Sequence, residues 1–294
     1  MSWWRDLKAT VIRDEPLKNK TNFKIGGKAR FFFSVKNEEE LRELVVISSK
    51  HKIPLFVLGA GSNILVSDVG IKGIVVKLGS GIFKEISFSK NNSVEAGAGV
   101  RLAELIGKTS AVGLSGLEFL AGIPGTLGGA IIMNAGAWGK DIGSIVESVR
   151  VMDNRGNIEL LKRKKIKFSY RHSGLDSYII LGAVLKLASD TKDRINQRIK
   201  EYLKLRSNTQ DNAYPNAGCI FKNPAGTSAG KLIDACGLKA KSCGGAVVSS
   251  RHANFILNKK NASSKDVLKL MNLIRDKVKS RFNITLEPEI KIWM

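Results

Sequence analysis

The first third of the chain combines one amphipathic helix with short apolar runs. Asn37 precedes glutamates at 38–40, and Glu40 stands three residues on, a spacing that predicts a helix start closed by a capping box. Leu41, Leu44 and Val45 follow on one helical face. Continuous apolar runs predict two buried strands, at 55–58 and 74–78.

The rest of the chain does not alternate helices and strands in a regular way. The middle part predicts one helix at 101–110, a hairpin turn at Asn154–Asn157, and strands at 94–97, 145–152, 158–161 and 178–187. The last third predicts a strand-like end at Ile284–Trp293, and helices near 193–206, near 228–236 and from Ser263 to about Phe282. The absence of regular βαβ units favours an α+β fold over a doubly wound sheet.

The chain is strongly basic. Its 48 lysines and arginines against 26 acidic residues give a formal net charge of +22, which raises affinity for polyanions. The basic residues are spread along the sequence, their densest run is Lys162–Lys165, and no aromatic RNA-binding motif or zinc-finger spacing accompanies them. The pattern therefore favours an anionic small-molecule substrate over nucleic acid, and we expect no membrane contact and no obligate protein partner.

The cysteines and histidines are few. Cys219, Cys236 and Cys243 are odd in number and unevenly spaced, which predicts neither a disulfide framework nor a zinc site, and no metal is expected. No apolar run approaches the roughly 20 residues of a membrane-spanning helix. Residues 1–16 show no secretory signal, so a cytoplasmic location is the default expectation.

Two glycine-rich segments carry the first chemical signal. The first, residues 59–63, follows a predicted strand, and its backbone N–H groups suit a diphosphate, although the third glycine of a dinucleotide fingerprint is missing. The second, residues 122–139, contains no charged residue. Because an interior glycine costs about 0.5–1 kcal/mol relative to alanine, we expect irregular backbone there and no packed helix. Either segment alone also fits a simple turn or core loop, whereas the pair favours a long phosphorylated cofactor.

Six motifs, in order, resemble one enzyme family. They are Thr21–Ala29, Gly59–Asp68, Gly122–Gly139, Ser169–Ser173, Ala217–Pro224 and Leu286–Ile290. Together they resemble the UDP-N-acetylenolpyruvoylglucosamine reductases, of the flavoprotein superfamily typified by vanillyl-alcohol oxidase. The lack of an insertion before the helix near 228–236 resembles the family's compact second type.

The resemblance implies an α+β fold with FAD between two α+β subdomains and a further α+β substrate-binding lobe. We assign the first subdomain to 1–72 with 285–294, the second to 73–190 and the substrate lobe to 191–284. Neither glycine-rich segment contains a histidine for covalent attachment, so non-covalent FAD is expected. The residues implied to hold it are Gly59, Ala60, Gly61, Ser62, Asn63, Gly122, Ile123, Pro124, Gly125, Thr126, Gly128, Gly129, Asn134, Ala135 and Gly136.

The resemblance also implies the reaction. NADPH reduces FAD, hydride passes to C3 of the enolpyruvyl group of the substrate, and C2 is protonated, which yields UDP-N-acetylmuramate for peptidoglycan precursor synthesis. Arg171 is implied to stabilise the charge that develops on the carboxylate, because its planar fork matches that group. Glu289 is implied to assist the same intermediate, as an acid or through a hydrogen-bond relay.

Cys219 stands where serine is the family's usual proton donor to C2. A thiol has a reference pKa of about 8.5 and can give up a proton, so the implied mechanism is retained. Further substrate contacts are implied at Tyr170, Lys222, Asn223, Arg206 and Gln210. His252 is read as structural.

Two other functions stay open on the residues alone. One is a different flavin oxidase of the same superfamily, acting on another alcohol and commonly carrying covalent flavin. The other is a non-catalytic, basic nucleic-acid-binding protein, which would be colourless.

Overall fold

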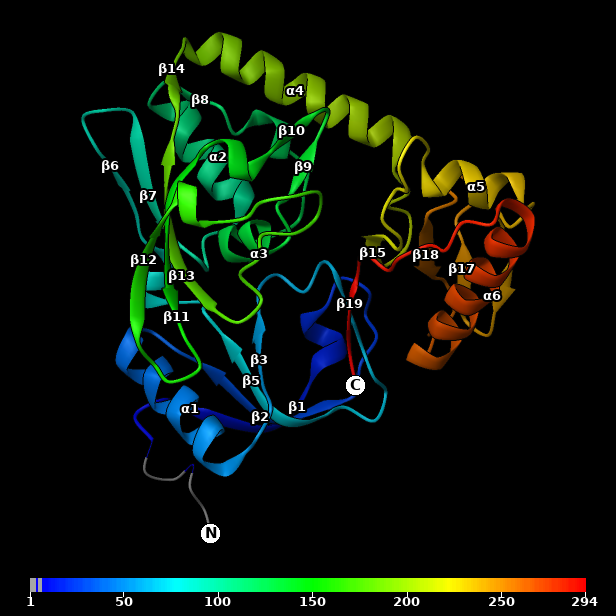
Figure 1. The fold of residues 1–294 in the computed structure, drawn as a ribbon, viewed down its shortest axis with the longest axis horizontal. Helices are drawn as coiled ribbons and strands as arrows, with labels where there is room; N and C mark the ends of the chain where they lie inside the picture. The colour runs from blue at the N-terminus through cyan, green and yellow to red at the C-terminus, as the bar shows by residue number, and fades with distance from the viewer. Residues whose placement is uncertain (1–3, 5–6) are drawn as a thin grey trace. The chain divides into compact units, whose positions relative to one another are not determined.

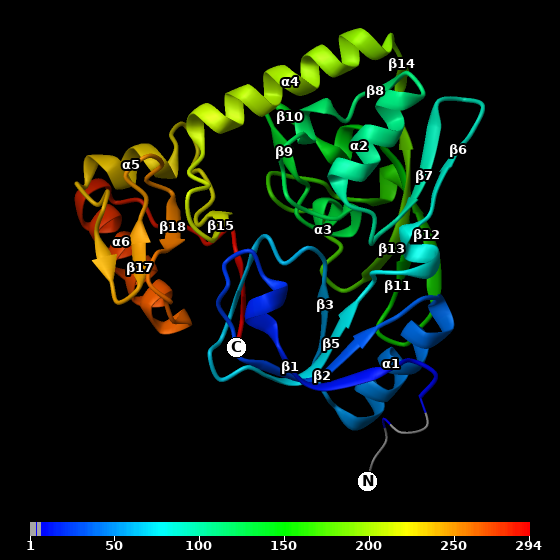
Figure 2. The same ribbon diagram turned by 180° about the vertical axis from the view of Figure 1, so that it is seen from behind.

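The computed structural model describes residue 4 and residues 7–294, which divide into two compact units whose elements are drawn in Figure 1 and Figure 2. Unit 1 comprises residues 1–13, 31–60 and 72–206, and unit 2 comprises residues 14–30, 61–71 and 207–294. Each unit buries its own hydrophobic core. Residues 1–3 and 5–6 lie outside the described residues. They belong to the N-terminal segment 1–16, for which the sequence predicts no secretory signal.

Unit 1 is built around a five-stranded antiparallel sheet of order β12-β11-β13-β7-β6. Its strands are β6 (Ile86–Phe88), β7 (Ser93–Gly97), β11 (Val146–Met152), β12 (Ile158–Lys162) and β13 (Ile179–Lys186). β11 and β12 form the predicted hairpin, with Met152 opposite Ile158. The predicted strands and the predicted helix, α2 (Leu102–Ala111), are therefore confirmed.

A second sheet has the order β1-β2-β5-β3. Its strands are β1 (Val11–Pro16), β2 (Lys28–Ser34), β3 (Leu55–Leu58) and β5 (Ile71–Lys77). The helix α1 (Glu38–His51) begins at Asn37, whose side chain accepts a hydrogen bond from the Glu40 N–H. The carboxylate of Glu40 accepts from the Lys36 N–H at 2.8 Å, so the reciprocal bond reaches one residue further back than a capping box requires.

The second glycine-rich segment contains a helix, α3 (Leu127–Ile132), so the prediction of irregular backbone was wrong there. Figure 1 shows α3 beside the five-stranded sheet, where it packs against β7 and β13. A methyl group added at Gly128 would lie 2.9 Å from the Cβ of Ala98. Close packing of helix on strand therefore requires glycine at this position and outweighs its poor helix propensity.

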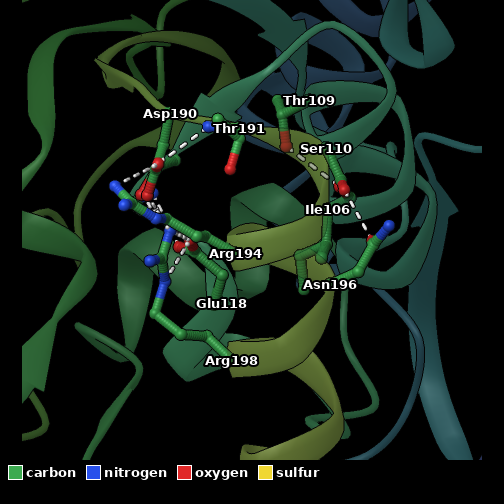
Figure 3. A network of polar contacts seen from close by, with 11 residues as sticks. Ile106, Thr109, Ser110, Glu118, Asp190, Thr191, Arg194, Asn196 and Arg198 are labelled. Atoms are coloured by element: carbon green, nitrogen blue, oxygen red, sulfur yellow. Dashed lines mark hydrogen bonds and ion pairs between the residues drawn. The ribbon is translucent and has the colours of Figure 1, made fainter.

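An ion-pair network attaches α4 (Lys192–Thr209) to the rest of unit 1 (Figure 3). Arg198 on α4 donates to Glu118 at 2.9 Å and to Asp190 at 2.7 Å. Glu118 is buried and also accepts from the Ser115 hydroxyl and the Gly116 N–H. Burial alone would raise the pKa of Glu118, but the backbone N–H groups, Arg198 and Ser115 together hold it below its ordinary value.

Replacing Arg198 with alanine is expected to lower the free energy of unfolding by about 1–3 kcal/mol, because a buried carboxylate loses its charged donor. Urea denaturation at pH 7 measures the change. Arg194→Ala is the matched control, since the Arg194 side chain is 75% exposed and lies 3.9 Å from Asp190; a change of less than about 0.5 kcal/mol is expected. If both variants lost the same free energy of unfolding, the stabilising role given to Arg198 would be contradicted.

The Arg198 contribution should depend on pH. Hydrogen bonding to Arg198 lowers the pKa of Asp190, and the pKa of Glu118 is also lowered. A carboxyl group whose pKa is lower in the folded state adds stability above its unfolded pKa, about 4, and loses it as the pH falls through the folded value. The stability difference between wild type and Arg198→Ala is therefore expected to shrink as the pH is lowered below about 4.

Unit 2 contains an antiparallel sheet of order β15-β18-β17-β16. Its strands are β15 (Asn216–Cys219), β16 (Ser242–Cys243), β17 (Ala246–Val248) and β18 (Phe255–Asn258). Figure 2 shows the helices α5 (Ala229–Ala235) and α6 (Ser264–Phe282) beside these strands. The predicted helix from Ser263 to about Phe282 is confirmed as α6. A capping box formed by Ser263 and Asp266 starts it, and its apolar residues Val267, Leu270, Met271, Ile274 and Val278 are buried.

The C-terminal strand returns to the region after the first glycine-rich segment. β19 (Lys291–Trp293) pairs in parallel with β4 (Ile64–Val66). Besides β16, the described part of the chain contains four further two-residue strands, β8 (Leu114–Ser115), β9 (Gly136–Ala137), β10 (Lys140–Asp141) and β14 (Ala188–Ser189).

The structure divides into two units, whereas the sequence predicts three lobes, and the two divisions group the chain segments differently. Residues 31–60 group with 72–206, and residues 61–71 group with 207–294. The lobe boundaries at 72, 190 and 284 stay a prediction. Over the described residues, no helix combines the length and the apolar character needed to cross a membrane.

Candidate active site

Arg171 lies at the tip of a tight turn in unit 1. Ser169 and His172 exchange two backbone hydrogen bonds, of 2.9 and 3.1 Å, which leave Tyr170 and Arg171 between them. Arg171 has a φ of +56°, in the left-handed region, which costs a residue with a side chain about 1–2 kcal/mol. A strained residue with an ionic side chain at the tip of a turn marks a functional-site candidate.

The second glycine-rich segment holds this turn in place. Asn134 is 2% exposed; its side-chain amide donates to the Ser169 carbonyl at 2.9 Å and accepts from the Gly143 N–H at 3.0 Å. The guanidinium of Arg171 donates to the Gly136 carbonyl at 3.0 Å. Two residues predicted to bind the cofactor thus brace the Arg171 turn, a role that sequence spacing did not indicate. Their contact with FAD stays a prediction.

Gly59, the first residue of the first glycine-rich segment, lies close to the second segment, and both positions belong to unit 1. A methyl group added at Gly59 would lie 2.7 Å from the hydroxyl oxygen of Thr126, so the backbone at Gly59 passes close to the residue that caps α3. In the second segment, Gly122, Pro124 and Gly129 are exposed, whereas Ile123 and Gly125 are half-buried. The Ala135 N–H donates a hydrogen bond to the Ala130 carbonyl.

Several backbone N–H groups of these segments have no acceptor. Within the part of the chain that the structure describes, the N–H groups of Ala60, Gly61 and Ser62 donate no hydrogen bond, nor do those of Gly125 and Thr126. Such groups are rare in a folded protein unless a ligand or water receives them. Successive free N–H groups are the donors that suit a diphosphate, and in unit 1 Gly125 and Thr126 present two of them side by side.

Unit 2 brings Cys219 and Glu289 onto neighbouring backbone segments. The Glu289 N–H donates to the Ile220 carbonyl at 2.8 Å, the Lys222 N–H donates to Glu287 at 2.9 Å, and Phe221 bridges Pro288. Both Cys219 and Glu289 are half-buried. A thiol and a carboxyl group therefore lie on two adjacent strand-like segments.

The first glycine-rich segment also contacts the segment that carries Glu289. The Asn63 side chain donates to the Glu289 carbonyl at 3.2 Å, and the Lys291 N–H donates to the Asn63 carbonyl at 2.9 Å. Ser62 is half-buried beside Asn63. The Asn63 amide therefore supports a predicted catalytic segment, which its predicted role as a cofactor ligand did not include.

The predicted substrate contacts are distributed over both units. In unit 2, Lys222 forms an ion pair with Glu287 at 3.3 Å, Asn223 accepts from the Ala229 N–H at the start of α5, and Gln210 is half-buried. In unit 1, Tyr170 is 52% exposed beneath the Arg171 guanidinium. Arg206 is buried, and its Nε donates to the Ala121 carbonyl at 2.7 Å, against the second glycine-rich segment.

Sequence reasoning missed Asn254. This buried residue lies in the His-Ala-Asn-Phe stretch, two residues after His252. Burial lowers the pKa of His252 and so favours the neutral ring, whose Nδ1 accepts from the Asn254 N–H at 3.3 Å. A neutral, packed histidine agrees with the structural reading of that residue.

This chain is similar to known proteins along nearly its whole length. A family model described as UDP-N-acetylenolpyruvoylglucosamine reductase, C-terminal domain, matches residues 209–293, and one described as FAD binding domain matches residues 29–162. The UDP-N-acetylenolpyruvoylglucosamine reductase of Desulforamulus reducens is 41% identical over 97% of this chain and 94% of its own length. That of Caldanaerobacter subterraneus subsp. tengcongensis is 43% identical over 95% and 92%.

Solved structures give the same picture. The crystal structure of the UDP-N-acetylenolpyruvylglucosamine reductase from Thermus caldophilus superposes with a TM-score of 0.82 at 34% identity, and the match covers 98% of this chain and 100% of that one. 6-Hydroxy-D-nicotine oxidase from Arthrobacter nicotinovorans gives a TM-score of 0.50 at 14% identity over 63% and 43%. The latter likeness concerns the fold alone.

Proposed function

This chain belongs to the family of UDP-N-acetylenolpyruvoylglucosamine reductases, and we propose that it reduces the enolpyruvyl ether of UDP-N-acetylglucosamine to UDP-N-acetylmuramate with NADPH as reductant. It is an oxidoreductase with an FAD-binding domain and the α+β fold of the vanillyl-alcohol oxidase type. The proposal includes a place in peptidoglycan precursor synthesis and a small-molecule UDP-sugar as substrate.

One observation carries the proposal furthest. The hydrogen bond from the Glu289 N–H to the Ile220 carbonyl sets the segment with Glu289 directly beside the segment with Cys219. The reaction must add one proton to C2 and must stabilise negative charge near it. A thiol donor and a carboxyl group on adjoining backbone supply side chains of the required kinds.

FAD, when bound, supplies the hydride that C3 of the enolpyruvyl group receives. In unit 1, the free N–H groups of Gly125 and Thr126 would bind its diphosphate. Arg171 carries a permanent positive charge at the tip of a braced turn, and it would stabilise the carboxylate on which charge develops. Cys219 would then give its proton to C2, and Glu289 would assist the same charged species, as an acid or through a hydrogen-bond relay.

Steady-state turnover tests this proposal. Without oxygen, purified, FAD-loaded protein should consume more than one equivalent of NADPH per flavin only when UDP-N-acetylglucosamine enolpyruvate is present, and the product should be heavier than the substrate by two hydrogen atoms. Mass spectrometry of the nucleotide-sugar checks the second point. NADPH consumption that ignores the enolpyruvyl substrate would remove the proposed substrate.

The FAD is expected to be bound without a covalent link, because residues 59–63 and 122–139 contain no histidine or cysteine. Acid precipitation of the yellow protein should leave all flavin absorbance in the supernatant. A covalently flavinylated oxidase, precipitated in parallel, serves as the control for retention. Flavin that stays with the pellet of this protein would refute the expectation.

A further inference from the structure

Asn254 uses both ends of its side chain on one backbone unit. The residue is 2% exposed, its Oδ1 accepts from the Phe221 N–H at 3.0 Å, and its Nδ2 donates to the Phe221 carbonyl at 2.8 Å. Its own backbone carbonyl accepts from the Ile220 N–H at 2.9 Å. Three hydrogen bonds from a single residue therefore fix the two residues that follow Cys219.

The strand before this clasp is irregular. β15 pairs with β18 at Asn216 opposite Leu257 and again at Cys219 opposite Phe255, with a break in register between these pairs. Gly218, in the break, has a φ of +76°. Bulges of this kind re-aim the side chain that follows and end regular pairing. Beyond Cys219, the Asn254 amide takes over the place of a strand partner.

The same two residues carry the contacts to Glu289. The Ile220 carbonyl accepts from the Glu289 N–H, and Phe221 bridges Pro288. Asn254 thus holds residues 220 and 221 on one side while the segment 287–289 binds them on the other. A shift of this backbone would move the Cys219 thiol and the Glu289 carboxyl group together.

We propose that Asn254 is a positioning residue that sets Cys219 and Glu289 for protonation of the substrate. In that step the S–H bond of Cys219 breaks, a C–H bond forms at C2, and the thiolate recovers its proton from solvent. The inference rests on the proposed function, because it needs Cys219 as the donor. A misplacement of about 1 Å at such a site can cost about 10²-fold in rate.

Asn254→Ala removes both side-chain hydrogen bonds, whereas Asn254→Asp keeps the shape and turns a donor into an acceptor that faces the Phe221 carbonyl. Asn258→Ala is the matched control. Asn258 is 8% exposed on β18, and its side chain likewise makes two backbone bonds, to the Phe23 carbonyl at 3.0 Å and from the Ala262 N–H at 2.7 Å. Loss of these bonds should destabilise unit 2 about as much as Asn254→Ala does, while the backbone of residues 219–222 keeps its hydrogen bonds.

The half-reactions are measured separately by anaerobic stopped-flow spectroscopy of FAD-loaded protein. Both Asn254 variants should oxidise the reduced enzyme with substrate about 10–10²-fold more slowly than wild type, while NADPH reduction changes by less than about threefold. Asn258→Ala should leave both half-reactions near wild type. Equal losses in both half-reactions, or the same pattern in Asn258→Ala, would overturn the inference.

A double-mutant cycle tests the route through Cys219. If Asn254 acts in part through the thiol, Asn254→Ala should slow the Cys219→Ala enzyme by a smaller factor than it slows wild type, because coupled residues are not additive; the remaining factor reflects Glu289. Full multiplication of the two effects would overturn the inference, as would near-normal turnover of Cys219→Ala alone. A wild-type enzyme whose flavin the enolpyruvyl substrate never oxidises would instead remove the proposed function itself.

Discussion

Arg171→Ala is expected to slow oxidation of the reduced enzyme by the enolpyruvyl substrate about 10²–10³-fold, the usual effect of removing one preorganised electrostatic contact. Reduction by NADPH should stay within about twofold of wild type, because that half-reaction builds no charge on the enolpyruvyl group. Anaerobic stopped-flow spectroscopy of the flavin measures both rates. Glu289→Ala is expected to show the same asymmetry, since the residue is proposed to assist the same charged species.

Two further variants separate chemistry from folding. Arg171→Gly removes the guanidinium and also relieves the left-handed backbone at φ +56°, so loss of activity there cannot be ascribed to added strain. Arg163→Ala is a control from the same unit, because Arg163 bonds the carbonyls of Gly143 and Ile166 and has no assigned role in the reaction. A parallel loss in both half-reactions for Arg171→Ala would point to damaged flavin binding and against charge stabilisation.

Cys219→Ala is expected to keep its FAD, to be reduced normally by NADPH, and to form product about 10²–10⁴-fold more slowly, the range for a lost general acid. Alanine offers no transferable proton. Cys219→Ser restores the donor that is usual in the family and should keep substantial activity, although oxygen is smaller than the sulfur it replaces. Product formation in a single turnover measures these differences.

Thiol chemistry gives an independent readout of the same residue. Cys219 is half-buried, so an alkylating reagent should inactivate the enzyme, with bound substrate slowing the loss. Cys236 and Cys243 are also half-buried, and a Cys236→Ser, Cys243→Ser background isolates the reaction at Cys219. Near-normal turnover of Cys219→Ala would transfer the donor role to water or to another side chain.

The elements with strong periodicity could be predicted from sequence. The stripe of α6, the hairpin of β11 and β12, and the face of α2 follow from local spacing of apolar residues. The strand β1 was missed because charged residues interrupt its apolar pattern, Val-Ile-Arg-Asp-Glu-Pro. α3 was excluded on propensity, whereas its glycine is required by the approach of Ala98, which lies far away in sequence.

The candidate site also combines features that local sequence predicts with features that depend on distant contacts. Arg171, Cys219 and Glu289 could be named as candidates because each occupies a fixed place within a short motif, and their roles stay predictions. Such motifs could not show that Asn134 braces Ser169 or that Asn254 clasps Phe221, because a buried amide gives no local sign of the backbone group it meets. The grouping of residues 14–30 and 61–71 with 207–294 likewise depends on long-range contacts.

The central claim, reduction of an enolpyruvyl nucleotide-sugar through FAD, is tested most directly without oxygen. The FAD-loaded enzyme is reduced with NADPH, mixed with UDP-N-acetylglucosamine enolpyruvate, and followed by flavin absorbance and product analysis. We predict that the absorbance of oxidised flavin returns rapidly and that UDP-N-acetylmuramate forms in equal amount. Flavin that stays reduced in the presence of this substrate, and is oxidised only when oxygen is admitted, would contradict the account.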